Sequence, residues 1–131
     1  MKCLILLFAS FFGIAAQAQT FQNADTISCP DSLENIYVRQ LYSDSLSSSF
    51  VIFIKKEVKL HKHNAHTEHV MVLQGEGTMV LGDSTFTIKK GNIVFIPKGT
   101  PHKVLTTSKI PLKVISIQSP NFDGSDRLML E

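Results

Sequence analysis

The sequence predicts an all-β fold, a sandwich or a barrel, built as a single domain. Short runs of β-branched and aromatic residues recur along the chain, and turns rich in Gly and Pro separate them. No stretch keeps the hydrophobic period of a helix over any useful length. A single helical turn is expected near residues 31–34. Many short strands with such turns are typical of a sandwich or barrel. The 131 residues suffice for one modest core.

The first residues have the form of a secretory signal peptide, predicted over 1–18. Lys2 precedes an apolar run over 4–16, and an Ala-Gln-Ala cleavage signature ends at Ala18. The run is shorter than the roughly 20 apolar residues of a membrane span, which favours cleavage over an uncleaved anchor. We therefore expect no stable membrane insertion. The expected product is an exported protein, in a bacterial periplasm or secreted, after cleavage near Ala18.

Charge and cysteine content exclude further classes. The formal net charge is only +2, and the lysines at 55, 56, 59 and 62 have no aromatic residues between them. This pattern indicates a solvated strand edge, and no nucleic acid is expected as a partner. Beyond the signal, Cys29 is the single cysteine, so no internal disulfide is expected. No base lies near it in sequence, which favours a spare thiol over a catalytic nucleophile.

The predicted strands begin at residue 35, after an extended N-terminal lead-in over 19–34. A Ser-rich loop separates the first strand from a β-branched and aromatic run that passes into an alternating stretch ending at His61. The strands are expected over 35–42, 50–54, 58–61, 69–73, 78–81, 85–88, 93–97, 102–107 and 111–118. The barrel is thus predicted over 35–119. The C-terminal tail, 120–131, begins with Pro120 and is expected to lack regular structure.

Histidines cluster in the run HKHNAHTEH, which also contains Glu68. The four are His61, His63, His66 and His69. Alternate residues on a strand face the same side, so the rings of His61 and His63 can converge. Glu68 starts the next strand, so its neighbour His69 should face the opposite way. His102 follows the turn IPKGTP and must come from another strand. Three imidazoles and one carboxylate suit a divalent first-row metal.

These residues resemble the two motifs of the cupins. The first motif is Gly, five residues, H-x-H, three or four residues, Glu, six residues and Gly; from its histidines onward it matches His61, His63, Glu68 and Gly75. The second motif is Gly, five residues, Pro-x-Gly, two residues, His, three residues and Asn; up to its histidine it matches Gly91, Pro97, Gly99 and His102. Two positions depart from the family pattern. Lys55 stands where the first motif begins with Gly, and Thr106 stands where the second ends with Asn.

The resemblance covers roughly residues 50–117 and implies a small double-stranded β-helix, or jelly-roll barrel. It also implies a metal bound by His61, His63, Glu68 and His102. The ligand types do not choose among Fe, Mn, Zn, Ni and Cu. His66 is expected beside the site rather than in it, and His69 outside the barrel. Because cupins often pair through edge strands and N-terminal arms, a homodimer is also expected.

The expected function is to bind or transform a small-molecule ligand at the metal. As an enzyme, the protein would be a metal-dependent dioxygenase, isomerase or similar. The alternative is a non-catalytic module of the cell envelope that binds or senses a metal or a small ligand. No tyrosine or carboxylate besides Glu68 lies beside the motifs. We therefore predict no separate catalytic residue and no further cofactor-binding residue, and any chemistry would rest on the metal.

Overall fold

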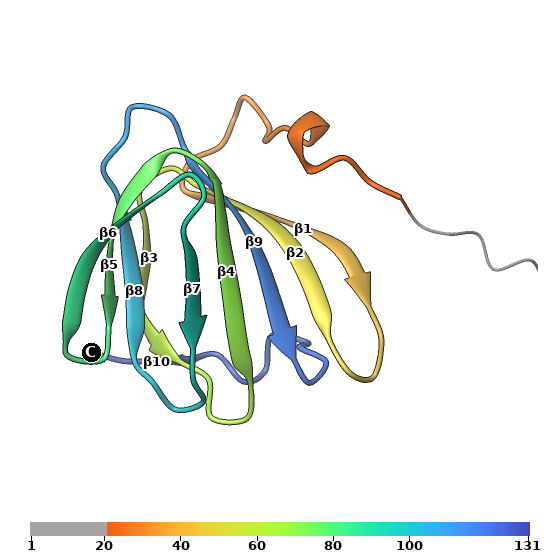
Figure 1. The fold of residues 1–131 in the computed structure, drawn as a ribbon, viewed down its shortest axis with the longest axis vertical. Coiled ribbons are helices and arrows are strands. Elements are labelled where there is room, and N and C mark those ends of the chain that lie inside the picture. Colours follow the sequence, from red (N-terminus) through yellow and green to blue (C-terminus); the bar gives the residue numbers. More distant parts are fainter. Residues whose placement is uncertain (1–20) are drawn as a thin grey trace, which may run out of the picture.

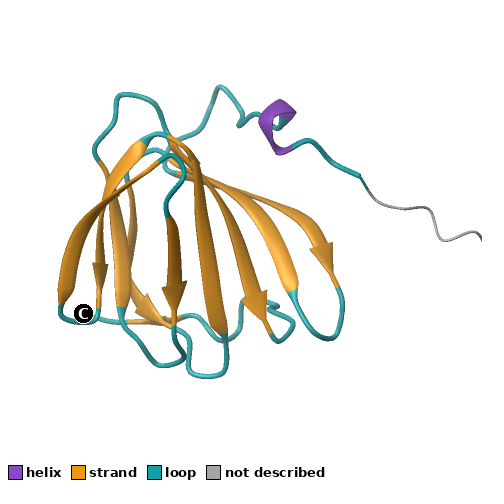
Figure 2. Ribbon diagram, in the orientation of Figure 1, coloured by secondary structure: helices purple, strands orange, loops and turns teal. Residues whose placement is uncertain are grey.

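The computed structural model describes residues 21–131 (Figure 1), so the predicted signal peptide over 1–18 lies outside the described residues. The regular structure of this part is almost entirely strand (Figure 2), which confirms the all-β prediction. Its single helical turn is the 3-10 helix η1 (Ala24–Thr26), and the turn expected near 31–34 is not helical. No helix within 21–131 has the length and apolar character needed to cross a membrane.

Ten strands follow one another along the described chain. They are β1 (Ile36–Ser43), β2 (Ser48–Ile54), β3 (Glu57–Lys62), β4 (Thr67–Gln74), β5 (Glu76–Leu81), β6 (Ser84–Lys89), β7 (Ile93–Ile96), β8 (His102–Thr106), β9 (Leu112–Ser119) and β10 (Leu128–Met129). The first nine match the predicted series in order. β10 was not expected, because its residues follow a polar, glycine-containing stretch that has no strand pattern.

The strands form two antiparallel sheets of five strands each. Their orders are β1-β2-β9-β4-β7 and β10-β3-β8-β5-β6, so consecutive strands often lie in different sheets. β2 and β3 illustrate this: Lys55 and Lys56 separate them, and each strand joins a different sheet. At the crossing from β4 to β5, Gly75 has a φ of 79°. A Cβ there would come within 2.9 Å of the Pro111 carbonyl oxygen, so only glycine fits.

The core lies between the two sheets. Side chains alternate along β9: Leu112 and Val114 are buried, while Ile117 on the opposite face is exposed. Inward-facing residues of both sheets supply the buried cluster, which consists of Ile54, Val70, Val72, Met79, Ile88, Val94, Ile96, Val104, Leu112 and Val114. This packing holds the sheets at a fixed separation, and the polar residues at one end of the interior are positioned by it.

Residues 21–34 cover part of the outer face of the first sheet. Ile27 and Leu33 are buried against Val51 and Phe53 of β2. The buried ammonium of Lys113 on β9 donates to the carbonyl oxygens of Ala24 and Ile27, at 2.6 and 2.8 Å. These contacts satisfy a charged group that would otherwise be costly to bury. The N-terminal segment is therefore packed onto the barrel.

The C-terminal tail also returns to the barrel. In β10, Leu128 and Met129 pair with Lys62 and His61 of β3, and the amide of Leu130 donates to the Leu60 carbonyl (Figure 1). The expectation that regular structure ends at Pro120 is therefore wrong. A two-residue strand carries too little pattern for detection in sequence, and it exists because the edge of β3 offers it hydrogen bonds.

Candidate metal centre

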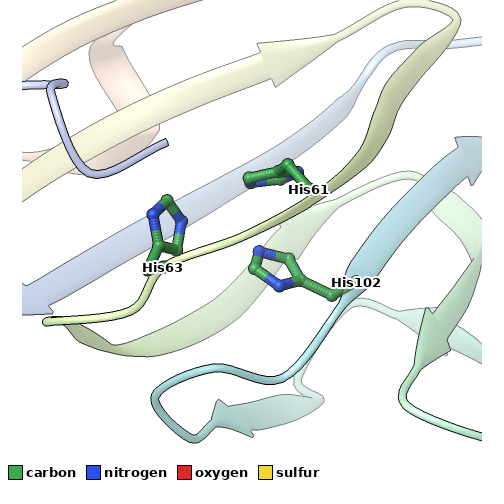
Figure 3. A group of neighbouring side chains, drawn as sticks. All are labelled: His61, His63 and His102. Atoms are coloured by element: carbon green, nitrogen blue, oxygen red, sulfur yellow. The ribbon is translucent and has the colours of Figure 1, made fainter. Parts of the chain in front are cut away.

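Three histidines meet at one end of the barrel interior. His61 lies near the end of β3, His63 just beyond it, and His102 at the start of β8. His61 and His102 are directly paired across the antiparallel β3–β8 ladder, and their ring centroids lie 4.1 Å apart. One donor atom from each of the three rings lies within 4.8 Å of the other two (Figure 3). All three side chains are buried.

Glu68 reaches the same point from the opposite sheet. It lies on β4, and its carboxylate oxygen Oε2 is 3.6 Å from Nε2 of His63 and 3.6 Å from Nε2 of His102. Its other oxygen, Oε1, accepts a hydrogen bond from the hydroxyl of Ser116 on β9. One carboxylate oxygen is thus fixed and the second faces the rings. The structure therefore groups the three predicted histidines and places Glu68 beside two of them, His63 and His102.

Backbone carbonyls orient all three rings. Nδ1 of His61 lies 2.8 Å from the Lys59 oxygen, Nδ1 of His102 lies 2.9 Å from the Thr100 oxygen, and Nδ1 of His63 lies 2.7 Å from the Asp126 oxygen. A carbonyl can only accept, so each Nδ1 carries the hydrogen. In a neutral ring, Nε2 then keeps its lone pair and faces the centre. Histidine ligands of metals are held in this way.

These donors fit a divalent metal ion. Two donors bound at about 2.0–2.2 Å lie at most roughly 4 Å apart, and the 3.6 Å separations from Glu68 fall within that reach. Nε2 of His102 is buried and has no hydrogen-bond partner among the described residues. A buried nitrogen lone pair without a partner is unfavourable. A cation at this point would satisfy it, so the His61, His63 and His102 triad could hold a metal.

Electrostatics also favour an ionised carboxylate beside neutral imidazole. Burial would raise the pKa of Glu68, but the imidazoles of His102 and His63 and the hydroxyl of Ser116 lower that pKa to about 2. Burial, together with the nearby ring of His102, lowers the pKa of His61 to about 4. For His63 burial acts in the same direction, but Glu68 and the Asp126 carbonyl outweigh it and raise the pKa. At neutral pH, Glu68 and His61 are therefore in the protonation states that metal ligands require.

The tail completes one side of the site. The Asp126 carboxylate accepts from the amides of Asn64 and Ala65, at 3.0 and 2.8 Å, and from Nδ1 of His66 at 2.6 Å. These bonds hold the loop between β3 and β4. Hydrogen bonding with His66, and then with the two amides, lowers the pKa of Asp126 to about 2. The ring of Phe122 meets those of His63 and His66 edge-on, with centroids 5.2 and 5.1 Å away.

The structure separates the clustered histidines as the strand alternation predicts. His66 is buried beside the site, and its Nε2 is 2.8 Å from the Asn121 carbonyl oxygen. His69 is exposed on the outer face of β4, where its ring lies against that of Phe95, with centroids 4.9 Å apart. Gly99, with a φ of 74°, forms the turn before His102, and its amide donates to the His63 carbonyl. This bond ties the two histidine-bearing segments together.

Sequence reasoning missed several residues around this centre. Ser116 and Gln118 continue the inward face of β9 after Leu112 and Val114, so two polar side chains on that face were a readable signal. Phe122, Asp126 and Arg127 gave no such signal, because the tail has no periodic pattern. Their positions depend on the pairing of β10 with β3.

The donors stand at one end of a partly open cavity of about 150 Å³. His61, His63, Glu68, His102, Gln118 and Arg127 are its polar lining residues. Apolar side chains from strands of both sheets form the remainder of the wall. The site therefore combines a polar head with an apolar chamber, which is the usual composition of a small-molecule pocket.

Comparison with known proteins identifies the family. The sequence profile of the cupin domain matches residues 50–118, more than half of the chain. The chain is a cupin. The matched segment runs from β2 into β9 and includes both histidine motifs, so the resemblance seen in the motifs extends over most of the barrel.

Individual relatives are similar to this cupin over most of its length. A protein of Aquifex aeolicus is 35% identical over 100 residues, 76% of this chain and 82% of the relative. A protein of Methanocaldococcus jannaschii is 33% identical over 81 residues, 62% of this chain and 65% of the relative. A Klebsiella pneumoniae protein with a double-stranded β-helix domain superposes with a TM-score of 0.73 at 18% identity, covering 84% of this chain and 92% of that one. This last similarity supports the jelly-roll fold.

Proposed function

We propose that this cupin binds a divalent transition metal through His61, His63, His102 and Glu68, and that the metal binds a small molecule in the barrel cavity. Two observations carry this proposal. Three rings, each held by a carbonyl at its Nδ1, bring donor atoms within 4.8 Å of one another. The buried Nε2 of His102 has no hydrogen-bond partner among the described residues. When bound, the ion supplies Lewis acidity to an oxygen of the small molecule. The four side chains leave coordination positions for that oxygen if the ion is five- or six-coordinate.

A second candidate is a binding or sensing module without turnover. The cavity lining favours it, because the titratable groups there are the four proposed ligands and Arg127. A general acid or base separate from the ligands is therefore missing from the described lining. Any chemistry would have to proceed at the metal without one.

Export and self-association are part of the proposal. Export is supported by the sequence of residues 1–18 alone. Pairing of two copies is supported by exposed apolar side chains on the outer face of β4, β7 and β9, among them Met71, Ile93 and Phe95. Neighbouring apolar side chains of this kind are typical of contact surfaces.

The test begins with metal analysis of the protein purified from its own host. We expect stoichiometric metal in the wild type and in His69→Ala, the exposed neighbour of Glu68. His63→Ala and Glu68→Ala should weaken binding beyond the roughly 100-fold upper range seen for groups outside the coordination sphere. Oxygen consumption and substrate loss are then followed with hydroxy acids, keto acids and phenols.

Each outcome has a distinct meaning. Metal bound with turnover supports an enzyme, and metal bound without turnover on the panel supports the binding module. If His69→Ala lost metal as completely as His63→Ala, the assignment of ligands from one strand face would be wrong. Absence of metal from the wild type, with no uptake on addition of Fe, Mn, Zn, Ni or Cu, would overturn the proposal.

A further inference from the structure

The wall of the cavity away from the histidines is apolar and reaches the surface. Ile36 and Val38 on β1 and Phe50 and Ile52 on β2 face inward along the open side, and Val38 is 51% exposed. No hydroxyl side chain lines the cavity within the described residues. A ligand with many hydroxyl groups would leave most of them without partners in this chamber, which is unfavourable. The walls therefore favour a hydrocarbon body.

The head of the cavity carries a positive balance once a metal is present. The proposed site has one carboxylate, Glu68, against a divalent ion, and the guanidinium of Arg127 adds a further positive charge. The Arg127 side chain is exposed, lines the cavity and forms no ion pair within the part of the chain that the structure describes. Its neighbour Asp126 fixes the backbone beside the site. The charge balance favours an anionic ligand.

Gln118 supplies an unused polar group at the same end. Its side chain is only 5% exposed, it lies directly opposite Glu68 in the β4–β9 ladder, and its Oε1 has no hydrogen-bond partner among the described residues. Buried amide oxygens are normally paired. Rotation of the amide can present either its oxygen or its NH₂ group to the cavity. Gln118 is thus placed to bind an oxygen-bearing head group of a ligand.

The size of the chamber limits the ligand. A volume of about 150 Å³ matches that of an apolar cavity known to accept benzene, so an apolar body of roughly six non-hydrogen atoms fits. A head group with two adjacent oxygens can bind a metal through both of them, as the open coordination positions permit. These limits together describe a short-chain acid rather than a sugar.

We infer, on the basis of the proposed metal site, that the ligand is a small monocarboxylate with an oxo or hydroxy group next to its carboxylate and an apolar body. The two oxygens face the metal, Arg127 and Gln118, and the body lies against the inner faces of β1 and β2. Arg127 and Gln118 are then specificity-determining residues. Arg127 selects the negative charge, and Gln118 positions the oxygens.

The experiment measures binding to the Co(II)-loaded protein by calorimetry and by its visible absorption. Two probes each change one property of α-ketoisocaproate: α-ketoglutarate has a second carboxylate, and isobutyl methyl ketone lacks the carboxylate. Mannose is the fourth probe and represents a polyhydroxylated ligand. We expect α-ketoisocaproate to bind at least about tenfold more tightly than the other three, since an unpaired second charge or an absent carboxylate loses the matching contact.

Variants test the two residues. Arg127→Gln and Gln118→Leu should each weaken α-ketoisocaproate roughly tenfold or more and should leave the weak binding of isobutyl methyl ketone nearly unchanged. A merely structural role would weaken both probes together. Arg39→Gln is the matched control, because Arg39 lies on β1 and its side chain bonds to Gln22 outside the cavity. It should bind all probes as the wild type does.

Metal content is measured for every sample, so that the two proposals fail separately. If the protein holds cobalt but binds mannose or α-ketoglutarate as tightly as α-ketoisocaproate, or binds none of the probes, the inference is overturned while the metal site stands. If the protein takes up no cobalt or other divalent ion, the proposed function itself fails. Unchanged α-ketoisocaproate affinity in both variants would remove their assigned roles.

Discussion

The two ends of the barrel interior are built from different side chains and are completed in different ways. At the apolar end, Val72, Ile88 and Leu112 are almost fully buried and belong to a single hydrophobic cluster. At the polar end, His61 and His102 each use one ring nitrogen on a carbonyl and direct the other inward. The apolar end has no polar group that needs a partner, whereas the polar end has donors that need one.

The supports of the two ends also differ. The apolar end depends on the alternation of side chains along strands, which is a local property of the sequence. The polar end depends on contacts across long separations: Ser116 with Glu68, and Asp126 with His63 and His66. We therefore expect stability and metal binding to respond to different substitutions.

The largest effect on stability is expected at the apolar end. Leu112→Ala removes a side chain with no exposed surface, and the cavity it leaves should lower the free energy of unfolding by about 2–5 kcal/mol. Bound metal per folded molecule should remain at the wild-type level, because Leu112 lies about 14 Å along β9 from Ser116, which supports Glu68. Urea denaturation and metal analysis measure the two quantities.

Leu46→Ala is the control for this substitution. Leu46 is 74% exposed in the loop between β1 and β2, so its loss should change stability by less than about 0.5 kcal/mol. Loss of metal from folded Leu112→Ala would contradict the separation of the two ends.

An intermediate effect is expected from the tail. Asp126→Ala removes the carboxylate that holds the Asn64 and Ala65 amides and His66. The loop beside His63 should loosen, and metal affinity should fall roughly tenfold, as for other groups that orient metal ligands. Competition with a chromophoric chelator measures this affinity.

Asp123→Ala is the matched control, because the Asp123 carboxylate bonds only to Ser125 within the tail. Its metal affinity should equal that of the wild type. Equal losses in both variants would show that the acidity of the tail matters rather than the specific contacts of Asp126.

The smallest effect concerns the pH dependence of the metal-free protein. His61 has a folded pKa of about 4, below its ordinary value of 6.5. Between those values the unfolded chain binds a proton that the folded chain does not, so stability should fall as the pH falls. Inside the window the change approaches about 1.4 kcal/mol for each pH unit.

Other groups titrate largely outside this window. The raised pKa of His63 makes its contribution disappear only as the pH rises above 6.5, and the lowered pKa of Glu68 acts below 4.5. Urea denaturation of metal-free wild type and His61→Gln between about pH 6.5 and 4.5 isolates the effect. The free energy of unfolding should change less steeply with pH in His61→Gln than in the wild type. Identical slopes would show that His61 is not the responsible group.

The strands and the ligand positions were accessible to sequence reasoning for a physical reason. A strand has a period of two, so His61 and His63 must share a face, and Glu68 and His69 must differ. The spacing of both motifs then indicated the cupin family, which the profile match over 50–118 shows. Ser116 and Gln118 were readable by the same period, but which of the inward positions lie beside Glu68 depends on the β4–β9 register.

The sequence by itself determined the all-β class, the order of the first nine strands and the faces on which the histidines lie, because these follow from local alternation and turn residues. Only the tertiary structure decided that the tail closes one side of the site. Phe122, Asp126 and Arg127 reach it because β10 pairs with the edge of β3 more than sixty residues earlier. Such pairing depends on an edge that exists only once the barrel has formed.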